Sequence, residues 1–438
     1  MSAVLTDPAR LASALLAARP RRAGRLVEVR GLHLLVRGLD SAVGDLVEVQ
    51  ADTGPVPAEV VASTVGGVVC LPLRSTHGLR AGASVHDTGA PLQIRVGEEL
   101  KGRVLDGLGQ PLDGGPSLAH LPRVPVEGPA PEALARRRVD RQVGLGVRAL
   151  DTLVPCGRGQ RLGVMAGSGV GKSTLLSMVA RGTEAAVSVI ALVGERGREV
   201  REFLENDLGP EGLARSVVVV ATSDAAPVER LRAAFVATRV AEWFRDRGED
   251  VVLMMDSLTR VAMAQREIGL SAGEPPATRG YPPSVFGILP RLLERAGPGA
   301  TGSITGLYTV LVEGDDLQDP IGDTARSILD GHVVLSRRLA TSGHYPSIDV
   351  LESLSRVAPV VTTEDQLQDA TALRRLLAAH RDVKELVEVG AYAAGSNPDA
   401  DRAIALLPRI DGFLRQRVGE PTSAADAWQQ LHALLETP

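Results

Sequence analysis

The sequence contains few residues of several chemically informative types. Among its 438 residues are two cysteines, Cys70 and Cys156, far apart in the chain, and eight histidines without ligand spacing. This pattern argues against a disulfide framework and a zinc site. Aromatic residues make up 3% of the chain and the formal net charge is -5. Both values argue against a nucleic-acid surface, because such a surface usually needs a basic face and stacking rings.

Long apolar runs are also missing. The longest, such as the valine-rich stretch 217–221, are far too short to cross a bilayer, and the N-terminus does not resemble a signal peptide. Hydrophobic residues nevertheless make up 44% of the chain, which is enough for the buried cores of about two to four domains. We therefore expect a globular protein of the cytoplasm.

Lysine is scarce, and one lysine stands in an informative place. The chain has only Lys101, Lys172 and Lys384, and Lys172 ends the glycine-rich run AGSGVGK directly before Ser173. An apolar stretch at 161–165 precedes this run, and a helical pattern at 174–179 follows it. Strand, loop and helix in this order are the context of a phosphate-binding loop. A glycine-rich turn without a ligand is the alternative, and the flanking pattern disfavours it.

The run supplies the groups that a nucleotide's phosphates require. Backbone N–H groups and the positive end of the following helix attract phosphate oxygens, while Lys172 reaches the outer phosphates and the Ser173 hydroxyl ligates Mg²⁺. We therefore predict that ATP and Mg²⁺ bind here. Ala166 stands where the general pattern has glycine, which matters only if that residue needs a positive φ. The predicted loop residues are Ala166, Gly167, Ser168, Gly169, Val170, Gly171, Lys172, Ser173 and Thr174.

Two carboxylates follow other apolar stretches that we expect to be strands. The run 251–255 ends in Asp256, which suits a central strand that delivers a second ligand to the Mg²⁺ held by Ser173. A helix cap is the alternative role for Asp256. The run 187–193 leads to Glu195, whose carboxylate is placed to orient an attacking water. Strand-to-helix turns are often acidic for other reasons, so both interpretations of Glu195 stay open.

The pattern along the chain indicates four segments. We expect residues 1–24 to be an N-terminal docking segment or a frayed terminus, with a short helix at 11–18. Short apolar stretches between turn signals predict a small β-barrel at 25–95. Alternating strands and helices predict a parallel α/β core at 96–361, and helical spacing predicts a C-terminal helical domain at 362–438. The expected barrel strands are 26–29, 32–36, 46–49, 59–62, 68–71 and 92–95.

Several longer motifs resemble a known family. They are GERGREV at 194–200, DSLTR at 256–260 and GEPPATRGYPPS at 273–284, and the segments 314–320, 327–332 and 343–349 continue the match. From about residue 25 onward the chain resembles the ATPases of type III protein export, relatives of the catalytic subunit of rotary ATP synthases. The resemblance implies a RecA-like P-loop NTPase core between a small N-terminal β-barrel and a C-terminal helical domain.

The resemblance also implies roles for single residues. Glu195 orients the water, and Arg196 lies near the γ-phosphate. Arg260 faces the phosphates or forms a salt bridge behind the metal site. Tyr345 stacks on adenine, unless it is a tyrosine held in a turn. Arg356 resembles an arginine finger that reaches into the neighbouring subunit's site, and a surface salt bridge is the alternative. The predicted catalytic residues are Lys172, Glu195, Arg196, Arg260 and Arg356, and the predicted metal ligands are Ser173 and Asp256.

The function implied by the resemblance is ATP hydrolysis in a homohexameric ring at the cytoplasmic face of an export gate, peripheral to the cell membrane. Flagellar export is the first interpretation. The implied partners are a central coiled-coil stalk protein, a regulator that binds the N-terminal segment, the export gate, and exported proteins or their chaperones. The loop 315–320 lines the pore of the ring or is an exposed acidic turn.

Other interpretations remain. An injectisome ATPase that serves virulence secretion stays open, because the site motifs of the two systems are alike. The scarcity of lysines and aromatics disfavours a hexameric RNA translocase. Glu195 beside an intact Lys172 disfavours a rotary subunit that does not hydrolyse ATP, and the 273–284 motif disfavours the catalytic rotary subunit itself.

Overall fold

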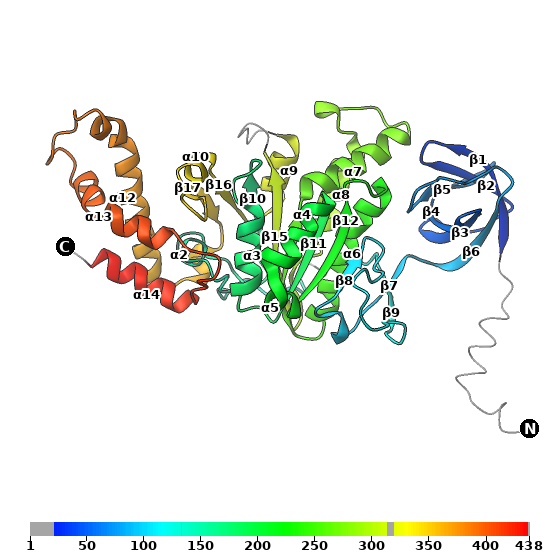
Figure 1. The fold of residues 1–438 in the computed structure, drawn as a ribbon, viewed down its shortest axis with the longest axis horizontal. Coiled ribbons are helices and arrows are strands. Elements are labelled where there is room, and N and C mark those ends of the chain that lie inside the picture. Colours follow the sequence, from blue (N-terminus) through cyan, green and yellow to red (C-terminus); the bar gives the residue numbers. More distant parts are fainter. Residues whose placement is uncertain (1–21, 133, 313–318, 437–438) are drawn as a thin grey trace, which may run out of the picture. The chain divides into compact units, whose positions relative to one another are not determined.

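The computed structural model describes residues 22–132, 134–312 and 319–436, and the chain divides into one unit up to Gln93 and a second from Ile94 onward (Figure 1). Within the described residues the first unit is a closed antiparallel barrel in the order β1-β2-β5-β4-β3-β6. The predicted small barrel is therefore confirmed. Its strands are β1 (Ala23–Arg30), β2 (His33–Arg37), β3 (Asp45–Ala51), β4 (Gly54–Thr64), β5 (Gly67–Pro72) and β6 (Ser84–Pro91).

Alternating apolar side chains build the interior of the barrel. Leu34 and Val36 of β2 are buried while the residues between and beside them are not, and Val47 and Val49 repeat this pattern in β3. Successive side chains of a strand point to opposite faces. One face of each of these strands therefore lines the barrel core.

One predicted barrel strand is wrong. The stretch 92–95 does not join the barrel, because β7 (Gln93–Arg95) pairs with β9 (Arg123–Pro125) in a separate two-stranded sheet. The sixth barrel strand is β6 instead. Val85 is its single fully buried residue, and without apolar alternation the sequence pattern gives no strand signal there.

The second unit is built on a mainly parallel sheet, nine-stranded within the described residues. Its order is β17-β16-β10-β15-β13-β11-β12-β8, with the short β14 beside β15. Neighbours from β16 to β8 run parallel, whereas β17 and β14 are antiparallel to theirs. The strands are β8 (Val104–Asp106), β10 (Arg161–Ala166), β11 (Val187–Glu195), β12 (Ser216–Thr222), β13 (Asp250–Asp256), β14 (Gly297–Pro298), β15 (Ser303–Leu311), β16 (Gly331–Leu335) and β17 (Ile348–Ser355).

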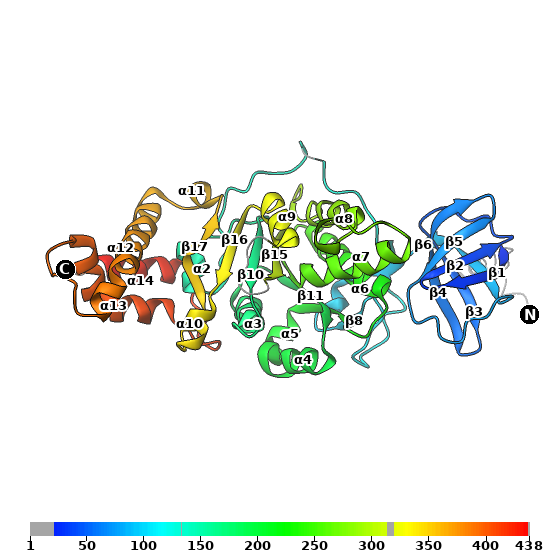
Figure 2. The same cartoon turned by 90° about the horizontal axis from the view of Figure 1, so that it is seen from above.

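Helices cover both faces of this sheet (Figure 2). On one face lie α3 (Lys172–Gly182), α4 (Gly197–Glu202) and α5 (Gly209–Ala214), and on the other lie α6 (Pro227–Arg245), α7 (Leu258–Ser271) and α8 (Pro283–Leu293). Covering both faces explains why the central strands are almost continuously apolar. The predicted parallel α/β core is thus confirmed, and the carboxyl ends of its parallel strands share one edge.

Three long helices form the C-terminal region. Thr363 begins the first of them with a capping box that includes Gln366. The helices are α12 (Glu364–Glu388), α13 (Pro398–Leu414) and α14 (Ala424–Leu435). Phe413 and Trp428 are buried in the core that these helices share with α2 (Arg148–Leu153) and the sheet. The predicted helical C-terminal region is confirmed.

Two predictions fall largely outside the described residues. The helix expected at 11–18 in the docking segment 1–24 is one of them, since the described residues begin at position 22. The loop 315–320 is the other, of which only Asp319 and Pro320 are described. Asp319 accepts hydrogen bonds from the backbone N of Ile321 at 3.0 Å and of Gly322 at 3.2 Å. It thereby caps α9 (Pro320–Ile328).

Candidate functional site

The predicted phosphate-binding loop connects the carboxyl end of β10 to α3. Gly169 and Gly171 have positive φ angles of 73° and 91°, a region that favours glycine, and Gly171 directly precedes the helix. Ala166 is the last residue of β10. Among the described non-glycine residues only Arg279 has a positive φ, so alanine at position 166 causes no backbone strain.

Lys172 is held between two carboxylates. Its Nζ lies 2.6 Å from Asp256 Oδ1 and 3.3 Å from Glu195 Oε1, and all three side chains are largely buried. Burial by itself would lower the pKa of Lys172, but the charges of the two carboxylates outweigh burial and raise that pKa above its ordinary value. A protonated ammonium group therefore stands beside the loop where phosphates are expected.

Asp256 ends β13 and is 2% exposed. Strand β15 lies between β10 and β13, and Thr309 of β15 donates from Oγ1 to Asp256 Oδ1 at 2.8 Å. Ser173, the other predicted ligand, is exposed in the first turn of α3. Carboxylate and hydroxyl oxygens are ligands that Mg²⁺ accepts, with phosphate and water oxygens filling its other positions. The residues present therefore fit a magnesium site.

Glu195 ends β11 just after an irregularity in the strand pairing at Gly194. Gly194 has a φ of 73°, and a Cβ added there would lie 3.0 Å from Cβ of Arg260. Glycine at this position therefore allows the Arg260 side chain to pack against the end of β11. Arg260 Nε is buried and has no hydrogen-bond partner among the described residues. A bound anion would satisfy such a donor, and the phosphate-facing role of Arg260 stays a prediction.

Arg196 does not join this cluster. Its side chain is 82% exposed, and its Nη1 lies 3.8 Å from Glu199 Oε1 at the start of α4. An exposed pair of this kind contributes little to stability. The structure thus places Arg196 in solvent, and its position near a γ-phosphate stays a prediction.

Tyr345 packs against the phosphate loop. A Cβ added to Gly171 would lie 3.2 Å from Tyr345 Cε1, so the ring and the loop are in contact. Ser347 Oγ donates to Val170 O at 2.5 Å and ties the same segment to the loop. Tyr345 is 42% exposed, and its ring offers a face on which a base can stack. Adenine stacking stays a prediction.

Arg356 lies at the opposite edge of the sheet. It follows Ser355, which pairs with Gly331 at the start of β16, whereas Leu335 at the other end of β16 pairs with Ala166. The length of β16 alone is roughly 15 Å. Arg356 is exposed, and its Nη2 donates to Arg326 O at 3.3 Å. Within one chain it is therefore far from the phosphate loop.

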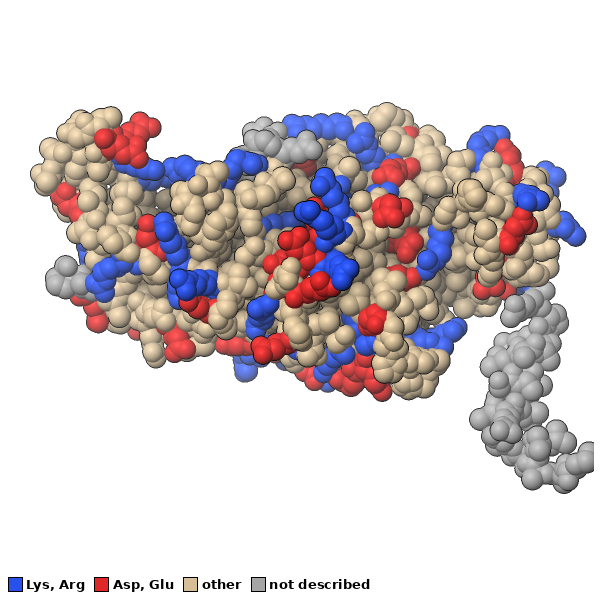
Figure 3. Space-filling view, viewed as in Figure 1, with Lys and Arg blue, Asp and Glu red and all other residues tan. Residues whose placement is uncertain are grey.

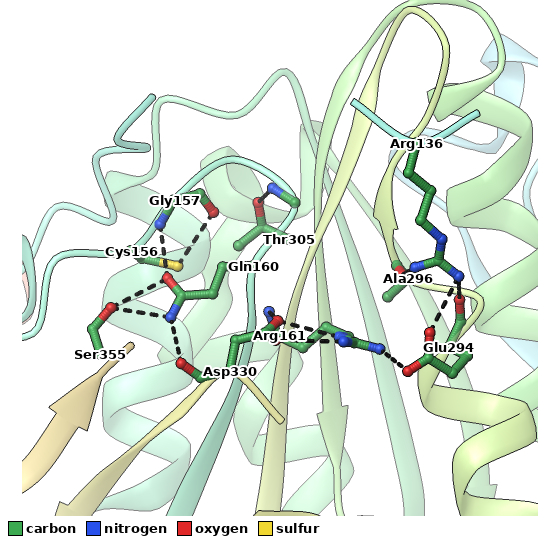
Figure 4. A network of polar contacts seen from close by, with 11 residues as sticks. Arg136, Cys156, Gly157, Gln160, Arg161, Glu294, Ala296, Thr305, Asp330 and Ser355 are labelled. Carbon is green, nitrogen blue, oxygen red and sulfur yellow. Dashed lines mark hydrogen bonds and ion pairs between the residues drawn. The ribbon is translucent and has the colours of Figure 1, made fainter. Parts of the chain in front are cut away.

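A polar network holds the end of β17 beside Arg356 (Figure 4). The buried Gln160 donates from Nε2 to Ser355 Oγ at 3.0 Å and to Asp330 O at 3.2 Å. Asp330 O also accepts a hydrogen bond from Arg356 N at 2.9 Å, and Arg161 Nε lies 3.2 Å from Asp330 Oδ2. The backbone at Arg356 is therefore fixed while its side chain is exposed.

Three residues of the site were not predicted from the sequence. Thr309 binds Asp256, as described above. Arg337 Nη1 donates to Ser168 O at 3.3 Å, and Gln416 N donates to Tyr345 O at 3.0 Å. No local motif marks these three residues, since only the fold brings them to the site.

Comparisons with protein families match two segments of the chain. Residues 146–355 match the nucleotide-binding domain of the ATP synthase alpha/beta family. Residues 362–433 match the C-terminal domain of the type III secretion ATPase EscN. The first segment contains the phosphate loop, both carboxylates and Tyr345.

Similar proteins cover nearly the whole chain. The chain is 49% identical over 417 residues to a flagellum-specific ATP synthase of Bacillus subtilis. The aligned region covers 94% of this chain and 95% of that protein. It is 51% identical over 417 residues to a type 3 secretion system ATPase of Xanthomonas euvesicatoria, with coverages of 95% and 93%.

Solved structures agree with these matches. The assembled ATPase EscN of enteropathogenic E. coli has a TM-score of 0.88 and 43% identity, covering 94% of this chain and 100% of that one. EscN in complex with its central stalk EscO gives the same TM-score of 0.88. Within the described residues, no helix has the length and apolar character that a membrane span requires.

Proposed function

Because the chain belongs to the type III export ATPases of the ATP synthase alpha/beta family, and is therefore an ATPase, we propose that its ATP hydrolysis supports the export of flagellar proteins. The observation that carries the hydrolysis is the cluster of Lys172, Asp256 and Glu195 at the carboxyl edge of the sheet, directly beside the phosphate loop. Lys172 supplies positive charge for the phosphates. Glu195 can position the attacking water, and Asp256 can hold Mg²⁺. The similarity to flagellum-specific ATP synthases supports the flagellar role.

Each group has one role in the proposed reaction. Lys172 exchanges its carboxylate partners for phosphate oxygens when ATP enters, and Glu195 accepts a hydrogen bond from the attacking water and aligns it with the γ-phosphate. Ser173 and Asp256 would hold Mg²⁺, which neutralises phosphate charge when bound. Thr309 keeps the Asp256 carboxylate oriented through the 2.8 Å hydrogen bond.

The location of Arg356 supports a ring of identical subunits. Arg356 lies at the edge of its sheet opposite its own phosphate loop and cannot reach that loop. A role as arginine finger therefore requires the phosphate loop of a neighbouring copy. EscN, which is similar over 94% of this chain, has been solved as an assembled ATPase and with a central stalk. We therefore propose a homohexamer with a coiled-coil stalk protein in its pore, facing the loop 315–320.

The remaining partners complete the proposal. The ring works in the cytoplasm at the inner face of the cell membrane, where residues 1–24 bind a regulator of the export apparatus. Exported proteins or their chaperones meet the ring there, beside the export gate. ATP hydrolysis around the ring then promotes their delivery or unfolding.

An injectisome ATPase is the second candidate, because a type 3 secretion ATPase is 51% identical to this chain. Deleting the gene separates the two functions. We expect loss of flagellar filament export with injectisome secretion intact, and restoration by the wild-type gene but not by Lys172→Ala. Loss of injectisome secretion alone would assign the protein to that system, and loss of neither would contradict an export function.

A further inference from the structure

A cavity of about 240 Å³ opens at the amino-terminal edge of the parallel sheet. It lies where three strands begin: Arg158 precedes β10, Asp250 opens β13 and Ser303 opens β15. Its charged lining residues are Arg137, Arg138, Arg141, Arg158, Asp140 and Asp250. The cavity therefore places the four arginines of residues 137–158 beside the starts of β13 and β15, which come much later in the sequence.

This cavity is separate from the nucleotide site. Strand β13 begins at the cavity with Asp250 and ends at the nucleotide site with Asp256, and its seven residues span roughly 20 Å. A ligand in the cavity is therefore not the nucleotide that the phosphate loop of the same chain holds.

Part of the lining is fixed by contacts within the protein. Arg158 Nη1 lies 2.5 Å from Asp250 Oδ2, and Ser303 Oγ donates to Asp250 Oδ1 at 2.6 Å. Arg137 Nε donates to Gly299 O at 3.2 Å. These bonds hold two guanidinium groups in place before any ligand arrives, which reduces the entropy lost on binding.

The other two arginines have no such contacts. Arg138 and Arg141 are exposed, and within the described part of the chain their side chains form no hydrogen bond or ion pair. Four arginines and two aspartates give the lining a formal charge of +2. On the face shown in Figure 3, by contrast, basic and acidic side chains are interspersed. The positive charge of the arginines around this cavity therefore favours binding of an anionic ligand.

We propose that this cavity binds a phosphate group, with Arg138 and Arg141 as its main ligands. A phosphate carries a charge of about -1.5 to -2 near neutral pH, which balances the charge of the lining. The planar guanidinium fork matches phosphate oxygens with paired hydrogen bonds. The phosphate comes either from a free phosphate compound or from the headgroup of a lipid.

The test uses the full-length protein with its nucleotide site saturated by ADP. Inorganic pyrophosphate is titrated in a calorimeter at constant ionic strength. We expect Arg138→Ala/Arg141→Ala to bind it at least tenfold more weakly than the wild type. Both side chains are exposed, so the variant should fold, and circular dichroism checks this. Equal affinity in this variant and the wild type would overturn the proposal.

A matched control variant loses the same two positive charges at another place on the protein. Arg30→Ala/Arg37→Ala removes two exposed arginines from the barrel, and its pyrophosphate affinity should equal that of the wild type. An equal loss of pyrophosphate affinity in this control would show that only the net charge of the protein matters, and it would overturn the proposed binding site. Sedimentation with phosphatidylglycerol vesicles then identifies the source. Loss of vesicle binding in the Arg138/Arg141 variant indicates a lipid headgroup, and unchanged vesicle binding indicates a free phosphate compound.

Discussion

Lys172 Nζ lies 2.6 Å from Asp256 Oδ1, and this ion pair joins the start of α3 to the end of β13. The strand between them, β15, contributes Thr309 to the same aspartate oxygen. In the structure the ammonium is thus neutralised by protein carboxylates. A nucleotide must therefore compete with Asp256 and Glu195 for Lys172.

Lys172→Ala should lose both ATP binding and turnover. The substitution removes the cation that meets the phosphates, and removing one partner of a buried charge pair costs about 2–5 kcal/mol. Titration with a fluorescent ATP analogue measures the affinity. Lys384→Ala, on the exposed side of α12, is the matched control and should bind as the wild type does. Unchanged affinity in Lys172→Ala would contradict the proposed phosphate contact.

Glu195→Gln should bind ATP almost normally and hydrolyse it about 10²–10⁴-fold more slowly, because the amide cannot accept the proton of the attacking water. Steady-state phosphate release gives kcat, and nucleotide titration gives the affinity. Glu199→Gln, four residues further on in α4, should leave kcat unchanged. A near-normal kcat in Glu195→Gln would remove this residue from the water-positioning role.

Arg356→Ala should bind ATP and lose about 10³–10⁵-fold in kcat, the range that arginine fingers contribute. Mixing Arg356→Ala with Lys172→Ala should restore part of the activity, because an intact phosphate loop of one variant then meets an intact Arg356 of the other. The specific activity of the wild type should also rise with protein concentration. Arg381→Ala, an exposed arginine of α12, serves as control, and mixtures without any recovery would speak against action between subunits.

Tyr345→Ala should raise KM for ATP with a smaller effect on kcat. Stacking of a base on an aromatic ring is worth about 1–3 kcal/mol, which corresponds to an increase of roughly 5–150-fold. Tyr345→Phe keeps the ring and should behave almost as the wild type. Equal KM values for the alanine variant and the wild type would show that the ring only packs on Gly171.

Asp113→Asn should lower stability in a pH-dependent way. Asp113 accepts hydrogen bonds from Arg103 Nε and Nη2 at 2.8 and 2.7 Å, and this guanidinium holds the pKa of Asp113 well below its ordinary value. The folded-state pKa is lower than the unfolded one, so the stabilisation is present above about pH 4 and is lost as the pH falls through the folded-state pKa.

We therefore expect Asp113→Asn to lose about 1.5–3 kcal/mol at pH 7 and less at pH 3. Thermal unfolding at the two pH values measures the difference. Asp323→Asn, which removes an exposed ion pair with Arg326, should change stability much less. An equal loss for Asp113→Asn at both pH values would show that the charge of Asp113 contributes nothing.

The sequence predicted the elements that short-range patterns encode. The phosphate loop was recognisable because Gly169, Gly171 and Lys172 follow a strand pattern and precede a helix pattern within a few residues. Asp256 and Glu195 were noticed for the same reason, since Asp256 directly follows an apolar run and only Gly194 separates Glu195 from another. The barrel strand β6 was missed because its exposed polar residues show no alternation.

Short-range sequence patterns could not predict the contacts between segments that are distant in the chain. The sequence marks Thr309 in no way, and its role depends on β15 lying between β10 and β13. Arg196 and Glu195 are neighbours in the chain, yet Glu195 is beside Lys172 and Arg196 is in solvent. Adjacent side chains at a strand end diverge, because the backbone turns there into the next helix.

The sequence by itself thus determined the chemistry of this protein: a loop for phosphates, a lysine, two carboxylates and the family motifs around them. Only the tertiary structure decided which carboxylates meet Lys172, that Arg356 lies at the far edge of its own sheet, and that four arginines from two separate segments surround one cavity. The physical reason is that sheet order and strand direction place these groups. Both depend on the packing of apolar strands and helices far apart in the chain, and no local sequence pattern records them.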